Sequence, residues 1–353
     1  MQYIQYQIST YKIIFSILFS VFAFVSFSDS LLSYDTEKLN SLIQEFSRHH
    51  PGSSVIIYNP DKGHVEYVFN RETAFRGFFS PGSIIKVFSA MAFMENAGQF
   101  QFNPSRRIIC RGKYFLLPSV RITPSDEKIF NIRRENDGRR YLRCSKSHGP
   151  TDLHNAIAHS CNVYFLSYAE KNSNLIYKIL VDRWKLNSSV KGSLNGAQIK
   201  LSANPFPGEI EILASSIGEG GLIRISPLKA AQIFGSFFIQ KNALIPSENI
   251  KANSATAYSM HYNRSAANDL LKALQAVHQT GTLSSMKITN SRVKILASKT
   301  GTGTQYGKIF STHAWNVIYF QIEGKKRVLV TFVKKGYGGK EAGQLSRLVI
   351  NHL

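Results

Sequence analysis

The pattern that most constrains the fold is a pair of β-hairpin signals, one near each end of the chain. Near the start, residues 55–58 and 64–69 are rich in β-branched and aromatic side chains and flank the turn sequence NPDKG. Near the end, residues 314–322 and 327–333 form a similar pair around a Glu-Gly turn. Strand signals at the two ends, separated by a long segment without such hairpins, predict one antiparallel sheet built from both chain ends.

Helical spacing of apolar residues is found at both ends and through the middle of the chain. The segments with this spacing are 35–46, 84–95, 153–170, 227–238, 266–278 and 340–349. With 353 residues, of which 43% are hydrophobic, the chain can bury a core as one large domain or two modest ones. We therefore predict an α+β fold in which a large helical region is inserted into the antiparallel sheet.

The charge balance is strongly basic. Lys and Arg number 43 against 22 Asp and Glu, which gives a formal net charge of +21. The basic residues occur as scattered pairs and form no stripe or known nucleic-acid module, so no nucleic-acid partner is predicted. The excess indicates attraction to an anionic surface such as phospholipid head groups or acidic wall polymers. The excess of basic residues is explained equally well if all proteins of the source are rich in Lys.

The first residues look like a targeting segment. Lys12 precedes an uncharged apolar run over 13–27, which is shorter than the roughly 20 residues that span a bilayer. Ser26 and Ser28 offer small residues at a plausible cleavage point. We predict that residues 1–28 are a signal peptide or membrane anchor, so the rest of the chain is exported, either periplasmic or anchored outside the cell membrane.

The chain has three cysteines, an odd number for an exported protein. Cys110 and Cys144 flank a basic, loop-like stretch and could form a disulfide, whereas Cys161 is predicted to be an inert thiol. A zinc site using Cys110, Cys144, His148 or His154 has no CxxC or HxxxH spacing to support it. The sequence therefore predicts neither a metal nor a cofactor.

The strongest chemical signal is the pair Ser83 and Lys86. They are three residues apart at the start of an apolar helical segment, so both lie on one helix face. A serine hydroxyl is a poor nucleophile without a base, and burial can lower the pKa of a lysine from about 10.4 far enough to provide one. The backbone N–H of Ser83 can also point toward a developing oxyanion.

Two further motifs follow Ser83 and Lys86 in order. The first is SCN at 160–162, and the second is KTG at 299–301. Three short motifs in this order are far more specific than any one of them. The KTG motif ends the apolar run 293–297, which we expect to be an edge strand that can bind an extended peptide.

With these motifs the sequence resembles the penicillin-binding transpeptidase family, which belongs with the β-lactamases to one fold superfamily. Further similarity lies in the Gly-rich sequence 217–220 and in Gly338-Gly339 near the end. The resemblance covers about residues 50–353, so we expect that segment to be the transpeptidase-like domain and 29–49 to be a lead helix.

The resemblance implies a role for each motif residue. Ser83 would be the acylated nucleophile, Lys86 its general base, and Ser160 the relay that passes a proton to the leaving group. The backbone N–H groups of Ser83 and Thr302 would form the oxyanion hole.

The remaining motif residues would bind the substrate. Asn162 would hold Lys86 and the substrate amide, and Lys299 would supply positive potential. Thr300 and Thr302 would bind the terminal carboxylate. Gly301 would let the substrate backbone approach closely.

The implied activity is that of a serine D,D-transpeptidase or D,D-carboxypeptidase. Such an enzyme acts on the D-Ala-D-Ala stem peptides of peptidoglycan and is acylated by penicillin and other β-lactams. Only 82 residues precede Ser83, so we expect neither a glycosyltransferase domain nor a long N-terminal pedestal.

Two alternatives remain. A class D-like serine β-lactamase shares the fold and the acylation step, but typically carries Val where Asn162 stands. A class A enzyme would need a Glu to activate water, and none occurs between Glu170 and Glu209. A non-catalytic β-lactam or cell-wall peptide sensor would also keep Ser83 and Lys86.

Overall fold

The computed structural model describes residues 34–187, 190, 207–249, 254–305 and 311–353. Residues Asp35–Leu353 form one compact unit. The predicted signal or anchor segment 1–28 lies outside the described residues. Within the described part of the chain, no helix combines the length and the apolar character that crossing a membrane requires.

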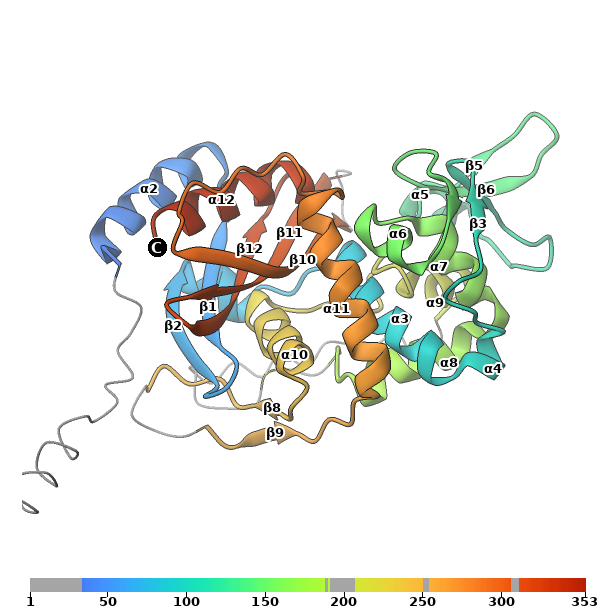
Figure 1. Ribbon diagram of the computed structural model, residues 1–353. Coiled ribbons are helices and arrows are strands. Elements are labelled where there is room, and N and C mark those ends of the chain that lie inside the picture. Colours follow the sequence, from blue (N-terminus) through green and yellow to red (C-terminus); the bar gives the residue numbers. More distant parts are fainter. Residues whose placement is uncertain (1–33, 188–189, 191–206, 250–253, 306–310) are drawn as a thin grey trace, which may run out of the picture. The chain divides into compact units, whose positions relative to one another are not determined.

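Figure 1 labels the helices. The first lies within the segment 29–49 that was expected to be a helix, and the last lies at the C-terminal end of the chain. They are α2 (Thr36–His49), α3 (Lys86–Glu95), α4 (Ala97–Phe100), α5 (Pro124–Ile129), α6 (Leu153–Ala158), α7 (Asn162–Ala169), α8 (Ser173–Lys178), α9 (Glu209–Ser215), α10 (Pro227–Ile239), α11 (Arg264–Gln279) and α12 (Gly343–Asn351). Short 3₁₀ or π turns are η1 (Glu72–Arg76), η2 (Gly82–Ile85), η3 (Glu170–Asn172), η4 (Ile179–Arg183) and η5 (Gly338–Ala342).

The strands fall into one large sheet and several small ones. They are β1 (Ser54–Asn59), β2 (His64–Phe69), β3 (Ile108–Cys110), β4 (Lys113–Phe115), β5 (Arg133–Arg134), β6 (Arg140–Arg143), β7 (Gly149–Thr151), β8 (Ala243–Leu244), β9 (Thr256–Tyr258), β10 (Val293–Gln305), β11 (Ser311–Ile322) and β12 (Lys325–Val333).

The large sheet joins the two ends of the chain. Its order is β10-β11-β12-β1-β2, and every neighbouring pair is antiparallel. The hairpin at the start of the chain therefore pairs, through β1, directly with the last strand, as the two hairpin signals predicted. The predicted α+β fold with a helical region inserted into the sheet is confirmed.

Both faces of this sheet are covered by helices. On one face Phe238 of α10 stacks on Tyr319 of β11, with ring centroids 4.7 Å apart. On the other face Ser346 of α12 accepts a hydrogen bond from Asn316 of β11 at 2.9 Å. Helix α2 contacts α12 on that side, and α11 lies between β10 and the helices α3 and α6 (Figure 1).

Two elements differ from what the sequence predicted. The single helix expected over 153–170 is broken between α6 and α7, because Ser160 has φ +59°, a left-handed value that cannot continue a right-handed helix. The strand expected to end near the KTG motif instead runs on to Gln305, because β11 supplies pairing partners along its whole length. The KTG motif thus lies inside an edge strand.

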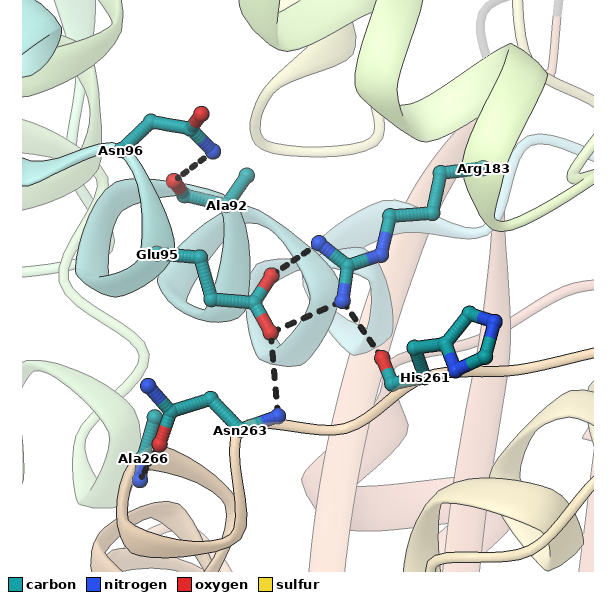
Figure 2. Close-up of polar contacts among 7 residues, drawn as sticks. All are labelled: Ala92, Glu95, Asn96, Arg183, His261, Asn263 and Ala266. Carbon is teal, nitrogen blue, oxygen red and sulfur yellow. Dashed lines mark hydrogen bonds and ion pairs between the residues drawn. The ribbon is translucent and has the colours of Figure 1, made fainter.

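The helix that begins with Lys86 is held firmly at its other end. Figure 2 shows that the guanidinium of Arg183, in η4, forms a bidentate pair with Glu95, the last residue of α3. The same guanidinium donates a hydrogen bond to the His261 carbonyl at 2.6 Å. Glu95 also accepts the backbone N–H of Asn263, the residue that caps α11. One carboxylate therefore ties α3 to η4 and α11.

We predict that Glu95→Ala lowers the free energy of unfolding by about 2 kcal/mol, because it leaves the Arg183 guanidinium partly buried without a counter-charge. Urea denaturation measures this change. Glu72→Ala is the matched control. It removes an exposed i,i+4 pair with Arg76 and should cost less than about 0.5 kcal/mol. Equal losses in the two variants would contradict the assigned role of Glu95.

Candidate active site

The candidate nucleophile lies on a tight turn in front of α3. Ser83 is half-buried in η2, and Lys86 is the first residue of α3. Gly82 has φ +53°, and a Cβ there would lie only 2.3 Å from the Thr302 carbonyl oxygen. Its N–H donates to the Gly218 carbonyl at 3.1 Å. Glycine is therefore required directly before Ser83, where the turn packs between β10 and the 217–220 loop.

The segment leading to Ser83 is held by two ring nitrogens of β11. Trp315 Nε1 donates to the Ser80 carbonyl at 2.9 Å, and His313 Nε2 lies 3.0 Å from the same oxygen. Phe79 stacks on Phe332 of β12. Because these partners belong to the core strands, the position of Ser83 is coupled to the central sheet.

Lys86 is completely buried beside the second motif. Its Nζ lies 2.8 Å from the Ser160 carbonyl, 3.4 Å from Ser160 Oγ and 2.5 Å from Asn162 Oδ1. Burial lowers the pKa of Lys86 to about 8, and the negative potential of nearby groups, Glu219 among them, opposes this shift. At pH 7 about a tenth of the side chain is therefore the neutral amine, and this fraction rises as the pH increases through about 8.

Lys299 of the third motif also contacts Ser160 of the second motif. Lys299 is also fully buried, and its Nζ donates to Ser160 Oγ at 3.1 Å and to the Thr300 carbonyl at 3.0 Å. Burial, with the positive charge of Lys86, lowers the pKa of Lys299 well below its usual value. The hydroxyl of Ser160 thus lies between two lysine amines.

The threonines of β10 present hydroxyl groups to the cleft. Thr300 and Thr302 are two residues apart and share one face of the strand. Thr300 Oγ1 lies 2.7 Å from Thr282 Oγ1, and Thr302 Oγ1 accepts the backbone N–H of Gly338 at 3.1 Å.

Gly301 has a role in the packing of the protein itself. A Cβ at this position would lie 2.7 Å from the Pro81 carbonyl oxygen and 3.0 Å from the Ile84 nitrogen. The space beside Gly301 is therefore filled by the turn that carries Ser83. Its lack of a side chain lets β10 and η2 approach each other, and this contact sets the distance between the first and third motifs.

A cleft of about 510 Å³ brings the predicted residues together. Its lining includes Ser83, Ser160, Asn162, Thr300, Gly301 and Thr302. Lys86 and Lys299 lie beneath this surface and contact it through Ser160 and Asn162. All eight residues singled out from the sequence thus belong to one site.

The structure adds Glu219, which the sequence interpretation missed, to the cleft. The sequence has no Glu between Glu170 and Glu209, where a class A enzyme would carry its water-activating carboxylate, and Glu219 lies beyond that stretch. Glu219 accepts the backbone N–H of Thr304 at 3.2 Å. Burial raises its pKa to about 7, against the opposing effects of Thr304 and the Lys86 charge. Glu219 could have been suspected from the sequence, because it is an acidic residue inside the Gly-rich sequence 217–220. Thr282 and Tyr337 also line the cleft and were not predicted.

The three cysteines remain free thiols in the structure, so the disulfide considered for Cys110 and Cys144 is not formed. All three are buried. Cys144 also lines the cleft, and its Sγ accepts the backbone N–H of Asn162 at 3.1 Å. Cys144 is therefore in contact with the second motif, of which Cys161 is itself a member.

The sequence matches the family described as "Penicillin binding protein transpeptidase domain" over residues 53–351. The chain belongs to this family. It is thus a penicillin-binding serine enzyme that acts on peptidoglycan, and transpeptidase domains of this kind are typically extracellular or periplasmic. No curated protein sequence matches the chain.

Solved structures of penicillin-binding proteins share the fold. The transpeptidase domain of Burkholderia pseudomallei penicillin-binding protein 3 aligns with TM-score 0.67 at 16% identity, over 92% of this chain and 94% of that one. Pseudomonas aeruginosa PBP2, solved in complex with WCK 5153, gives 0.68 at 17% identity, over 90% and 74%. Helicobacter pylori PBP2 gives 0.66 at 18% identity, over 90% and 62%. At these identities the likeness concerns the fold.

The lowered pKa of Lys86 predicts a pH dependence of acylation. Only the neutral amine can accept a proton from Ser83, so the rate should rise as the pH rises through about 8. We expect the second-order rate constant for penicillin acylation to increase roughly tenfold between pH 7 and pH 9. Stopped-flow acylation with a fluorescent penicillin measures it.

Glu219→Gln provides the control for this pH profile, because it removes another group of the cleft, whose pKa is about 7. The variant should keep the rising limb. Loss of the limb in Glu219→Gln would assign the titration to Glu219 and refute its assignment to Lys86.

Proposed function

We propose that this protein is a serine D,D-acyltransferase that cleaves the D-Ala-D-Ala end of peptidoglycan stem peptides through an acyl-enzyme on Ser83. The observation that carries the proposal is the chain of polar contacts from Lys86 through Ser160 to Lys299, along the floor of the cleft that Ser83 lines. Family membership and the order of the three motifs support it.

The first step is the transfer of a proton from Ser83 to Lys86. A neutral lysine amine has two N–H bonds and one lone pair. The Ser160 carbonyl and Asn162 Oδ1 accept the two N–H bonds, at 2.8 Å and 2.5 Å. This arrangement leaves the lone pair to accept the Ser83 proton as Oγ attacks the substrate carbonyl carbon.

The leaving group then needs a proton. As the peptide C–N bond breaks, the terminal D-Ala departs as an amine, and the proton held on Lys86 must reach its nitrogen. Ser160 Oγ lies 3.4 Å from Lys86 Nζ and 3.1 Å from Lys299 Nζ, so its hydroxyl can pass one proton on while receiving another. Lys299 holds that hydroxyl in place.

The edge strand β10 supplies the binding surface. Its unpaired edge can align an extended peptide, and the backbone N–H groups of Ser83 and Thr302 serve as the oxyanion hole. Thr302 already accepts a hydrogen bond from Gly338, so its hydroxyl proton remains available for a substrate carboxylate. Thr300 lies on the same face, and the buried Lys299 adds positive potential when it is protonated.

The same acyl-enzyme supports both outcomes of the reaction. Attack on the ester by an amine of a second stem peptide gives transpeptidation, and attack by water gives carboxypeptidase activity. In both cases the Ser83 oxygen leaves and regains its proton, so the site returns to its starting state.

Labelling with a β-lactam tests the nucleophile. The intact mass of the penicillin-treated protein should rise by one drug molecule, and Ser83→Ala should abolish the rise. Lys86→Ala should slow acylation about a thousandfold, because the nucleophile loses its base. Adding Ser160→Ala to that variant should cost little more, since both residues serve one proton path.

The control for this experiment is Ser145→Ala, which changes another serine of the cleft that carries no proposed role. It should be acylated at nearly the normal rate. Stoichiometric labelling of Ser83→Ala would refute the assignment of the nucleophile. Fully additive losses at Lys86 and Ser160 would refute a shared proton path.

The second candidate function is a serine β-lactamase, and Glu219 is the observation that favours it. A β-lactamase needs a base that activates water against the acyl ester, and Glu219 brings a carboxyl group into the cleft. The contacts of Lys86 oppose a class D mechanism. Carbamylation would add an anionic carboxylate to Nζ, which is fully buried and closely packed against Ser160 and Asn162.

We predict that the penicilloyl adduct persists for minutes or longer, and that neither bicarbonate nor Glu219→Gln changes its lifetime. The ring-opened β-lactam keeps its leaving amine attached, so the position of the acyl acceptor stays blocked. Mass spectrometry over time and nitrocefin hydrolysis measure this. Multiple turnovers per second that increase with bicarbonate, or that disappear in Glu219→Gln, would identify a β-lactamase.

A further inference from the structure

Four side chains converge on one buried point beside the second motif. They are Cys110 at the end of β3, Cys144 directly after β6, His148 directly before β7, and Cys161 between α6 and α7. Their sulfur atoms and a ring nitrogen of His148 all lie within 4.8 Å of one another. None of the three cysteines is more than 4% exposed, so the point is shielded from solvent.

The individual distances fit ligands of a single tetrahedral ion. Cys110 Sγ lies 3.4 Å and Cys144 Sγ 3.5 Å from His148 Nδ1, and the Sγ atoms of Cys144 and Cys161 are 3.9 Å apart. Zn²⁺ with bonds of about 2.3 Å to sulfur and about 2.0 Å to nitrogen separates two sulfurs by roughly 3.8 Å and a sulfur from a nitrogen by roughly 3.5 Å. The structure reproduces both separations.

Neither a disulfide nor a thiol–imidazole hydrogen bond fits these distances as well. A disulfide would bring two sulfurs to about 2.05 Å, which is far shorter than the 3.9 Å between Cys144 and Cys161. A thiol–imidazole hydrogen bond would account for one sulfur near His148 Nδ1, because that nitrogen has either one N–H or one lone pair. Here two sulfurs lie at almost equal distances from it.

We propose that Cys110, Cys144, Cys161 and His148 form a closed structural Zn²⁺ site. The three cysteines bind as thiolates and His148 binds through Nδ1. Formation of three Zn–S bonds releases three thiol protons to solvent, with no change in oxidation state. Four protein ligands complete the tetrahedron, so no position is left open for water, which is typical of a structural site. Thiolate and imidazole ligands together suit Zn²⁺ better than Mg²⁺ or Ca²⁺.

The proposed zinc site would stabilise the small sheets that surround it. The small sheets that contain β3 and β6 are two or three strands wide and have little core of their own. A metal bound by Cys110, Cys144 and His148 would link these strands, as metals do in small domains that cannot bury enough apolar surface.

The metal would also fix the catalytic turn. Cys161 lies between Ser160, which has a left-handed φ of +59°, and Asn162, which begins α7. The backbone N–H of Asn162 donates to Cys144 Sγ at 3.1 Å, as an outer hydrogen bond to a ligand sulfur does. The Ser160 carbonyl and Asn162 Oδ1, which accept the hydrogen bonds of the Lys86 amine, flank Cys161 and are therefore held in place by the metal cluster.

The experiment measures zinc directly and does not depend on activity. The full-length protein is purified under reducing conditions without a chelator, and its metal content is determined by mass spectrometry. We expect one zinc per chain. Replacement by Co²⁺ should give the absorption of tetrahedral cobalt with thiolate charge transfer. Cys110→Ser and His148→Ala should each lower the affinity for zinc at least tenfold in competition with a chromophoric chelator.

His154→Ala is the matched control, because His154 lies on the same stretch of chain but is exposed and outside the cluster. It should bind zinc normally. Should the ligand variants fail to fold, zinc release from the unmodified protein still tests the site. Chelation should make all three thiols reactive to a thiol reagent, and added zinc should protect them again.

Several results would overturn the proposal. These are a reduced protein that binds no zinc even when zinc is added, a stoichiometric disulfide within the freshly purified protein, a different metal bound at full occupancy, and equal zinc loss in His154→Ala. The proposed acyltransferase function would survive each of them. Conversely, an unlabelled Ser83 in a protein with one zinc would refute the enzyme assignment while leaving the metal site intact.

Discussion

The buried amine of Lys86 is the constraint on which the rest of the site depends. A lysine enclosed by protein pays a desolvation cost for its charge, which lowers its pKa toward neutrality. The amine keeps its position because the Ser160 carbonyl and Asn162 Oδ1 accept its hydrogen bonds. Burial therefore allows part of Lys86 to be a neutral amine near physiological pH, and the two acceptors orient that amine. The proposed role of Lys86 as the base for Ser83 requires both effects.

The architecture brings these groups together from distant parts of the chain. Helix α3 carries Lys86 at one end and is tied down at the other by Glu95 and Arg183. The turn in front of it is held against β10 because Gly82 and Gly301 have no side chains, and against β11 through the Ser80 carbonyl. The central sheet thus sets the position of the nucleophile from two sides.

The second motif receives its support from a different region. It lies where α6 ends and α7 begins, outside the central sheet, and its backbone takes a conformation that a serine adopts only when its surroundings impose it. The buried thiols of Cys110 and Cys144 and the partly exposed imidazole of His148 surround Cys161 in this turn. A metal there would give the second motif a rigid support comparable to the one that the sheet gives to the first and third.

Much of the fold could be read from local sequence patterns. The strands at both chain ends were predicted close to their observed bounds, because each pair flanks a short turn and β-branched residues favour extended backbone. The helix break at Ser160 could not be predicted. Apolar spacing continues through it, and only the packing of the surrounding segments imposes the left-handed conformation.

The sequence by itself determined the family, because the pair Ser83 and Lys86, an SCN tripeptide and a KTG tripeptide occur in one fixed order that few families share. Only the tertiary structure decided which groups touch. It assigned Gly301 to the protein's own packing, brought Glu219 into the cleft, and gathered three cysteines and a histidine from separate segments of the chain. The physical reason is that burial and distance between remote residues arise from the packed chain, whereas spacing motifs record only neighbours along it.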